Sequence, residues 1–147
     1  MDINERRIIL KIPSETNYLQ RIREFIAGIA EDVGFTDGDL EKIVMSVDEA
    51  CANIMEHAYT NDDSKVEGIS ITLISDDEKL TILLEDKGIY FDPTKAEKQV
   101  DFNKMISDAA KGGLGLYIML NLMDKIEYTR LPNNEGNQLK LIKYFKK

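Results

Sequence analysis

Apolar residues recur at helical spacing along residues 40–59, which carry the strongest periodic pattern in the chain. The apolar positions are Leu40, Ile43, Val47, Ala50, Cys51, Ile54 and Ala58. Residues four apart on a helix lie nearly in line, each about 6 Å further along the axis. Glu49, Asn53 and His57 therefore form a polar line that borders the buried face. On this stretch alone, however, Glu49 and Asn53 fit two solvated helix residues better than a functional site.

Two elements precede this central helix. Residues 6–12 are rich in Ile and Leu and end before a proline, which predicts a strand. Ser14 is a candidate N-cap for a following helix. The apolar face of that helix comprises Leu19, Ile22, Phe25, Ile26, Ile29, Ala30 and Val33. Gly34 suits the end of this helix, and Thr36 and Asp39 have the capping-box spacing that opens the central one.

Four apolar, β-branched segments predict further strands, at residues 69–74, 80–85, 126–130 and 138–145. The first two are separated by SDDEK and are expected to form an antiparallel hairpin. The last two are joined by the turn residues PNNEGN. Because sequential strands pair and helices cluster, we expect an α+β fold. This fold is a two-layer sandwich with one mixed, mostly antiparallel sheet and helices on one face.

One long connection interrupts this pattern. Residues 92–113 carry charges, a proline and paired glycines, and they lead directly into an apolar helix at residues 114–123. A connection of about 20 residues in a compact domain is usually functional or mobile. Since no repeat, low-complexity segment or linker is evident, residues 1–147 are interpreted as a single domain.

The composition restricts the classes of partner. The chain has 147 residues, of which 43% are apolar and 31% charged, as expected for a globular domain with a substantial core. Lys and Arg number 19 against 27 Asp and Glu, a net charge of -8. This balance argues against binding of nucleic acid through its phosphates and against a polybasic membrane contact.

The single cysteine, Cys51, lies on the apolar stripe and is expected to be a small core residue. One cysteine allows no intrachain disulfide, which fits a reducing cytoplasm. With one Cys and one His, a structural zinc site is not expected. The charged N-terminus does not have the pattern of a signal peptide, and no run approaches the ~20 apolar residues that span a bilayer.

A second informative stretch is EDKGIYFDP, residues 85–93. Asp86 ends an apolar strand, and Gly88 lies two residues further on. A carboxylate at a strand end can accept a hydrogen bond from an amino group such as that of adenine, and a nearby glycine lets the backbone approach a flat ring. An ordinary Asp-containing turn explains the same residues equally well.

A third stretch, KGGLGL at residues 111–116, precedes a helix. Glycines at a helix N-terminus expose backbone N–H groups, and the helix dipole adds positive potential, which suits a phosphate. The spacing is neither that of a Walker loop nor that of a dinucleotide-binding fingerprint. Lys111 and Lys104 can add positive charge, although single lysines are more often simply solvated.

Together these stretches give E-x-x-x-N on a helix, D-x-G after a strand, and a long loop ending in G-G-x-G-x before a helix. This combination resembles the nucleotide pocket of the GHKL, or Bergerat-fold, ATPases over nearly the whole chain. In that family the helix carboxylate is a base and the Asn holds magnesium against the triphosphate. The strand-end Asp reads adenine, and the long loop, residues 92–113 here, is an ATP lid.

The motifs DEACANIMEHAY, DKGIYFDP and GGLGLYIMLNLMDKI resemble in particular the bacterial anti-sigma-factor serine/threonine kinases. On this resemblance, Glu49 is the expected base and Asn53 the Mg²⁺ ligand. The expected contacts to ATP are Asn53, Asp86, Gly88, Lys111, Gly112, Gly113, Leu114, Gly115 and Leu116. The implied partners are a sigma factor, a small STAS-type anti-anti-sigma protein and a second copy of the chain, paired through its N-terminal strand and helix.

The chain departs from the family pattern at two positions. Tyr90 stands where many relatives have a second glycine. Near the last strand, where many relatives place a Thr that reaches adenine through water, Asn137 either substitutes or has no such role. His57 lies within the nucleotide-site helix rather than on a separate dimerisation helix. Histidine autophosphorylation is therefore not expected, and His57 is interpreted as a packed or solvent-edge residue.

Three functions are consistent with these motifs. The first is a serine/threonine kinase that also sequesters a sigma factor, favoured by the intact pair of Glu49 and Asn53. The second is a non-catalytic switch that binds ATP and changes its affinity for a partner. The third is an interaction domain whose nucleotide motifs have decayed, which the retained glycines and polar residues make the least favoured.

Overall fold

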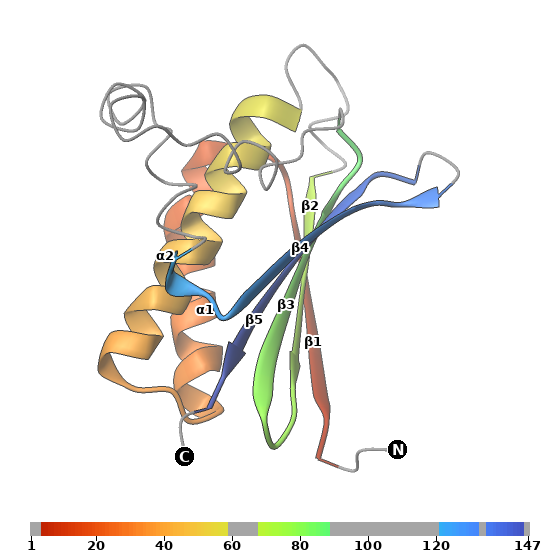
Figure 1. The fold of residues 1–147 in the computed structure, drawn as a ribbon. Helices are drawn as coiled ribbons and strands as arrows, with labels where there is room; N and C mark the ends of the chain where they lie inside the picture. The colour runs from red at the N-terminus through yellow and green to blue at the C-terminus, as the bar shows by residue number, and fades with distance from the viewer. Residues whose placement is uncertain (1–3, 59–67, 89–120, 133–134, 146–147) are drawn as a thin grey trace, which may run out of the picture.

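The computed structural model describes residues 4–58, 68–88, 121–132 and 135–145. Five strands form one antiparallel sheet in the order β1-β2-β3-β5-β4. The strands are β1 (Arg6–Ile12), β2 (Ile69–Ser75), β3 (Lys79–Asp86), β4 (Lys125–Arg130) and β5 (Asn137–Tyr144). The helices α1 (Leu19–Asp32) and α2 (Asp37–Asn53) lie side by side on one face of this sheet (Figure 1). The predicted two-layer α+β architecture is confirmed.

The predicted hairpin of β2 and β3 is confirmed, and β4 and β5 also pair with each other. Every strand pairing in the described part of the chain is antiparallel. The β3–β5 pairing joins two strands that are distant in sequence. Among the described residues, no helix has the length and apolar character needed to cross a bilayer.

The start of α1 differs from the prediction. Ser14 is not its N-cap, because a 3₁₀ turn, η1 (Thr16–Tyr18), precedes the helix, and Tyr18 occupies the N-cap position without a side-chain cap bond. The Ser14 side chain is instead buried, and its hydroxyl has no hydrogen-bond partner among the described residues. The extra turn separates the proline from the helix, so the serine lies too far from the first helical N–H groups.

The end of α1 follows the prediction. Gly34 has φ +114°, which a residue without a Cβ adopts at little cost. Its N–H donates to the Glu31 carbonyl oxygen and the Phe35 N–H donates to the Ala30 carbonyl oxygen, each at 3.0 Å. These two bonds form a Schellman motif, which satisfies carbonyl groups that the helix end leaves unpaired.

Helix α2 begins one turn before its apolar stripe. Thr36 occupies the N-cap position in an extended conformation, as the spacing predicts, but its side chain makes no cap bond. At the other end, the α-helix stops at Asn53 and a π turn, η2 (Ile54–Ala58), continues it. Such π turns within helices are rare and frequently mark functional sites. Residue 59, the last of the predicted helix, lies outside the described residues.

The core fills the space between the sheet and the two helices. The strand register aligns Leu73, Ile82, Leu141 and Ile126 in one row across the inner face of the sheet. Each fully buried side chain of this size contributes about 1.5–3 kcal/mol relative to exposure. Cys51 is fully buried in the same cluster, and burial raises the pKa of its thiol. The predicted role of this cysteine as a core residue is confirmed.

Candidate functional site

Two structural elements bring those predicted site residues that the structure describes to the same end of the molecule. Helix α2 and strand β3 both run toward the upper end in Figure 1, so the last turns of α2 and the end of β3 lie at that end. The inner face of β3 buries Leu80, Ile82, Leu84 and Asp86 in strict alternation. Asp86 is thus on the face of the sheet that the helices cover.

Glu49 and Asn53 lie one turn apart near the end of α2, and both are half-buried. They flank Ala50 and Cys51, which are buried in the core. Partial burial raises the pKa of the Glu49 carboxyl, and the neighbouring charge of Asp48 raises it further. A carboxylate with a raised pKa is better suited to accept a proton near neutral pH than an ordinary glutamate.

An ion pair between the two helices adjoins this carboxylate. Arg23 on α1 donates from Nη1 to Asp48 Oδ1 at 2.8 Å. Arg23 falls on or near the polar side of α1, where a solvated side chain would be the usual expectation. Arg23 thus pairs with the carboxylate that precedes Glu49 in the helix.

Asp86 is the most constrained residue of the site. Its side chain is only 6% exposed, and its Oδ1 accepts the Gly88 N–H at 2.9 Å in an Asx turn. Burial raises the pKa of the Asp86 carboxyl, although the hydrogen bonds from Asn137 and Gly88 oppose this shift. The predicted D-x-G motif is therefore a fixed turn at the strand end.

Asn137 lies directly opposite Asp86 in the β3–β5 register. Its Nδ2 donates to Asp86 Oδ1 at 3.1 Å and to the Gly88 carbonyl oxygen at 3.2 Å. The sequence indicates Asn137 only as a possible contact for the ligand, and it does not predict these bonds to the D-x-G turn. The signal that could have revealed them is the G-N pair that opens the strand, once β5 is paired with β3.

Gly136 permits this close approach of the two strands. It has φ +116°, and a Cβ atom at this position would lie 2.0 Å from the Asp86 carbonyl oxygen. Its own carbonyl oxygen accepts the Leu131 N–H at 2.8 Å, which closes the turn between β4 and β5. Only glycine combines this backbone conformation with contact to the neighbouring strand.

Several predicted contacts lie outside the described residues. These are Lys111, Gly112, Gly113, Leu114, Gly115 and Leu116, with Lys104 and Tyr90. The lid at 92–113 and all but the end of the predicted helix at 114–123 lie there as well, and the side chain of His57 is likewise not described. Their assignment remains a prediction from the sequence.

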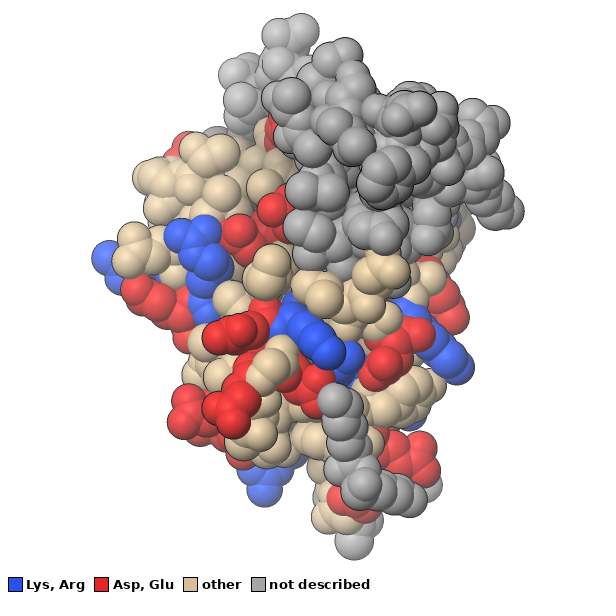
Figure 2. Space-filling model, turned by 60° about the vertical axis from the view of Figure 1, so that its left-hand side comes forward, with Lys and Arg blue, Asp and Glu red and all other residues tan. Residues whose placement is uncertain are grey.

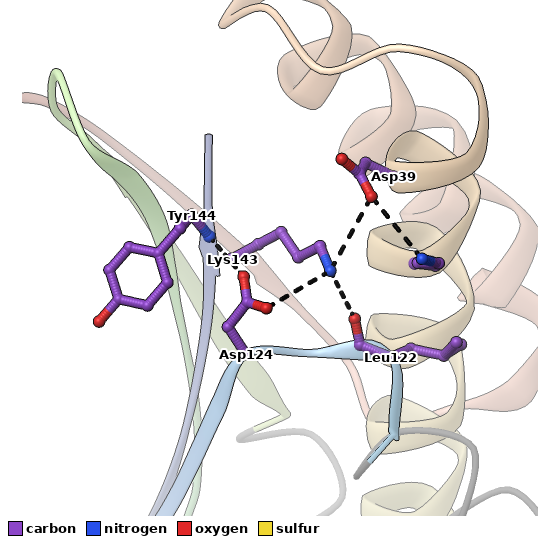
Figure 3. A network of polar contacts seen from close by, with 6 residues as sticks. Asp39, Leu122, Asp124, Lys143 and Tyr144 are labelled. Atoms are coloured by element: carbon purple, nitrogen blue, oxygen red, sulfur yellow. Dashed lines mark hydrogen bonds and ion pairs between the residues drawn. The ribbon is translucent and has the colours of Figure 1, made fainter. Parts of the chain in front are cut away.

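A buried lysine anchors the segment that follows the lid (Figure 3). Lys143 on β5 donates from Nζ to the Leu122 carbonyl oxygen at 2.9 Å. The same ammonium forms ion pairs with Asp124 at 3.8 Å and with Asp39, in the first turn of α2, at 3.9 Å. Asp124 also accepts the Tyr144 N–H at 2.7 Å. This cluster joins β5, the segment leading into β4 and the start of α2.

Positive and negative side chains are interspersed over the described part of the face shown in Figure 2. Ion pairs account for part of the charge on the helices, including Arg23 with Asp48 and Lys42 with Asp39. In the described part of the chain, no cluster of three or more His, Cys, Asp or Glu is placed to hold a metal by protein ligands alone. The predicted Mg²⁺ site relies on the carboxamide oxygen of Asn53 alone, with phosphate and water as the remaining ligands.

Comparison with known proteins agrees with this architecture. Residues 12–143 match the histidine kinase-like ATPase domain family. A protein of Bacillus cereus (strain ATCC 10987 / NRS 248) named serine-protein kinase RsbW is 34% identical over 144 residues, covering 96% of this chain and 86% of its own. A protein of the same name from Bacillus thuringiensis subsp. konkukian (strain 97-27) is 33% identical with the same coverage.

A solved structure shows the same fold. The chain containing the RsbU and RsbW domains of Rv1364c from Mycobacterium tuberculosis superposes with a TM-score of 0.68 at 13% identity. The match covers 97% of this chain and about a third (33%) of that longer one.

Proposed function

Because the chain belongs to the family of histidine kinase-like ATPase domains, we propose that it is an ATP-dependent serine/threonine protein kinase that acts as an anti-sigma factor. One observation carries this proposal. Glu49, with its raised pKa, lies one turn from Asn53 at the end of the fold where Asp86 is held in its turn. These residues occur in a chain that is 34% identical to proteins named serine-protein kinase.

In the proposed site, Asp86 accepts a hydrogen bond from the amino group of adenine, and Gly88 lets the ring approach the backbone. Asn53 contributes its carboxamide oxygen to Mg²⁺, which usually needs few protein ligands when phosphates supply the others. The proposed phosphate contacts are those of the glycine loop, Lys111, Gly112, Gly113, Leu114, Gly115 and Leu116. We also propose that residues 1–147 form one domain, with a lid at 92–113.

ATP, when bound, supplies the γ-phosphoryl group that is transferred. Glu49 accepts the proton of the attacking serine hydroxyl, which makes the oxygen a better nucleophile. The raised pKa of Glu49 brings its basicity closer to that of a base working near neutral pH. The packing of Ala50 and Cys51 into the core sets which side of α2 carries Glu49.

The proposed partners are a STAS-type anti-anti-sigma protein, which is phosphorylated, and a sigma factor. Such partners place the proposed activity in the cytoplasm. A second copy of the chain is proposed to pair through β1, which is an edge strand of the sheet. Ile9 on this strand is 57% exposed, and an exposed apolar edge strand favours pairing with another chain.

The test uses the purified protein, γ-labelled ATP and the STAS-type protein encoded nearest to it. We expect Mg²⁺-dependent transfer of label to a serine or threonine of that protein by the wild type. Glu49→Gln is expected to lower the rate by about a hundredfold or more while ATP still binds, since it removes the general base but preserves the side-chain volume. Glu41→Gln, an exposed position on the same helix, is the matched control and should leave the rate unchanged.

The outcomes separate the candidate functions. Nucleotide binding by the wild type without any phosphate transfer would contradict the kinase and leave a non-catalytic switch. Absence of nucleotide binding would contradict both functions. Equal transfer by Glu49→Gln and wild type would remove the role given to this carboxylate.

A further inference from the structure

The Asp86 carboxylate, which is proposed to bind adenine, is held by a second side chain. Asn137 donates its amide hydrogens to the D-x-G turn, one to Asp86 Oδ1 and one to the Gly88 carbonyl oxygen. Asn137 is 2% exposed and Asp86 is 6% exposed, so water competes little for these bonds. A buried carboxamide that directs both donors at one turn is a specific arrangement rather than a surface contact.

The orientation of the Asn137 amide follows from its neighbours. Both partners, a carboxylate oxygen and a carbonyl oxygen, are acceptors. The reversed amide would place its own carbonyl oxygen against two acceptors and would make neither bond. The hydrogen-bond pattern thus fixes which atom is the nitrogen.

The two oxygens of Asp86 consequently have different environments. Oδ1 receives two donors, the Gly88 N–H and Asn137 Nδ2. Within the described part of the chain, these are the donors that the carboxylate receives. Any other orientation, apart from the half-turn that exchanges the two equivalent oxygens, would break both bonds. One oxygen is therefore bound by the protein, which leaves the other, Oδ2, for a ligand.

We propose that Asn137 is a positioning residue that sets the nucleobase preference of this site. It holds Asp86 so that Oδ2 presents a single acceptor to the base, which selects a purine with an amino donor at position 6 over one without it. This inference rests on the proposed function, because it assumes that adenine binds at Asp86.

The surrounding backbone supports this role. The β3–β5 register places Asn137 opposite Asp86. Gly136 has no Cβ, so the two strands can approach each other closely at this point. Gln138, the next residue, donates to Glu85 Oε1 at 2.8 Å on the outer face of the sheet. The same two strands therefore carry two side-chain bonds in neighbouring register positions, and only the inner one adjoins the proposed base site.

The test measures dissociation constants of Mg-ATP and of Mg-purine riboside triphosphate, which lacks the 6-amino group, by calorimetry. Wild type should prefer ATP by about tenfold or more, as expected for a hydrogen bond to a charged acceptor. In Asn137→Ala only the Gly88 N–H still holds Oδ1, so the carboxylate is less constrained and the preference should fall clearly below that of the wild type. Gln138→Ala is the matched control and should keep the wild-type preference.

Asn137→Asp provides a second variant of nearly the same shape in case the alanine variant does not fold. At pH 8 the introduced carboxylate repels that of Asp86 and has no proton to donate, so the preference for ATP should be lost. As the pH falls and the pair shares a proton, the donor returns and the preference should rise. A residue that acted only on fold stability would weaken both nucleotides equally and would leave their ratio unchanged.

The outcomes distinguish this inference from the proposed function. If the wild type binds ATP with a clear preference that Asn137→Ala retains, the positioning role is wrong and the nucleotide site stands. If the wild type binds both nucleotides equally, Asp86 does not read the 6-amino group and the inference is overturned. If the wild type binds neither nucleotide, the proposed function itself is overturned.

Discussion

Arg23 on α1 and Asp48 on α2 form a 2.8 Å ion pair in the position adjacent to Glu49. Both side chains are partly exposed, so the pair itself contributes only about 0.2–1 kcal/mol to stability. Burial raises the pKa of Glu49 most, and the charge of Asp48, which Arg23 contacts, raises it further. The second of these two causes therefore comes from a residue that takes part in a contact between two helices.

Replacing either residue of this ion pair should shift the pH profile of kcat/KM, and the two replacements should shift it in opposite directions. Arg23→Ala leaves the charge of Asp48 uncompensated, so the pKa of Glu49 rises and the acid limb of the kcat/KM profile moves to higher pH. Asp48→Asn removes the charge, so the same limb moves to lower pH. Phosphate transfer measured over a pH series checks both.

Both variants break the same ion pair, so a loss of stability alone would change them in the same direction. Arg21→Ala, an exposed position on the same helix, serves as the control and should not shift the profile. Parallel shifts in the two variants would contradict the electrostatic role of the pair.

The charge of Asp86 is expected to lower the stability of the folded protein, although it serves the proposed binding of ATP. Its raised pKa in the folded state means that the native protein binds more protons than the unfolded chain between the two pKa values. This carboxyl therefore favours folding below the unfolded pKa of about 3.9 and opposes it as pH rises through the folded pKa. Asp86→Asn should unfold at higher urea concentration than wild type at pH 7, because its amide carbonyl can still accept both hydrogen bonds.

The urea series at several pH values gives the check. The gain in stability of Asp86→Asn over the wild type should shrink toward zero below the unfolded pKa of Asp86. ATP binding by this variant at pH 7 should weaken by about tenfold or more, because an amide nitrogen replaces the oxygen that accepts the hydrogen bond. A variant that is less stable than wild type at pH 7 would show that the charge of Asp86 is not a cost to folding.

Lys143 is expected to matter for stability. Lys143→Met keeps the length of the side chain but leaves the Leu122 carbonyl oxygen without this donor and Asp39 and Asp124 without this cation. We expect a loss of about 1–3 kcal/mol in the free energy of unfolding, measured by urea denaturation. Lys140→Met, on the same strand with an exposed partner in Glu127, should change it by less than about 1 kcal/mol.

Gly136 is expected to tolerate no side chain. In Gly136→Ala the new Cβ would meet the Asp86 carbonyl oxygen at 2.0 Å in a backbone conformation of φ +116°. The expected loss is about 2 kcal/mol or more, together with weaker ATP binding. Thermal denaturation and calorimetry measure the two effects.

Gly28→Ala is the matched substitution, because a Cβ at this exposed position of α1 meets no atom within 4 Å. It should stabilise the helix by about 0.5–1 kcal/mol. If Gly136→Ala were as stable as wild type, the close contact between β3 and β5 at this point would not be required.

Much of the fold was predictable because its signals are local. The apolar stripe of α2, the Schellman end of α1 at Gly34 and the apolar runs of β2 and β3 each depend on residues within a few positions of one another. The same holds for the spacing of Glu49 and Asn53, which a single helix fixes. The prediction of Ser14 as the cap was wrong because one 3₁₀ turn moved the start of the helix.

The sequence by itself therefore determined the main helices and strands of the described part of the chain and the fold class, and it names the residues that we propose to do the chemistry. Only the tertiary structure decided which other residues contact these side chains and their neighbours. Asn137 reaches Asp86 across 51 residues of sequence through the pairing of β3 and β5, and Arg23 on one helix reaches Asp48 on the next. Periodicity is set by the backbone geometry of one element, whereas these contacts exist only once separate elements pack against each other.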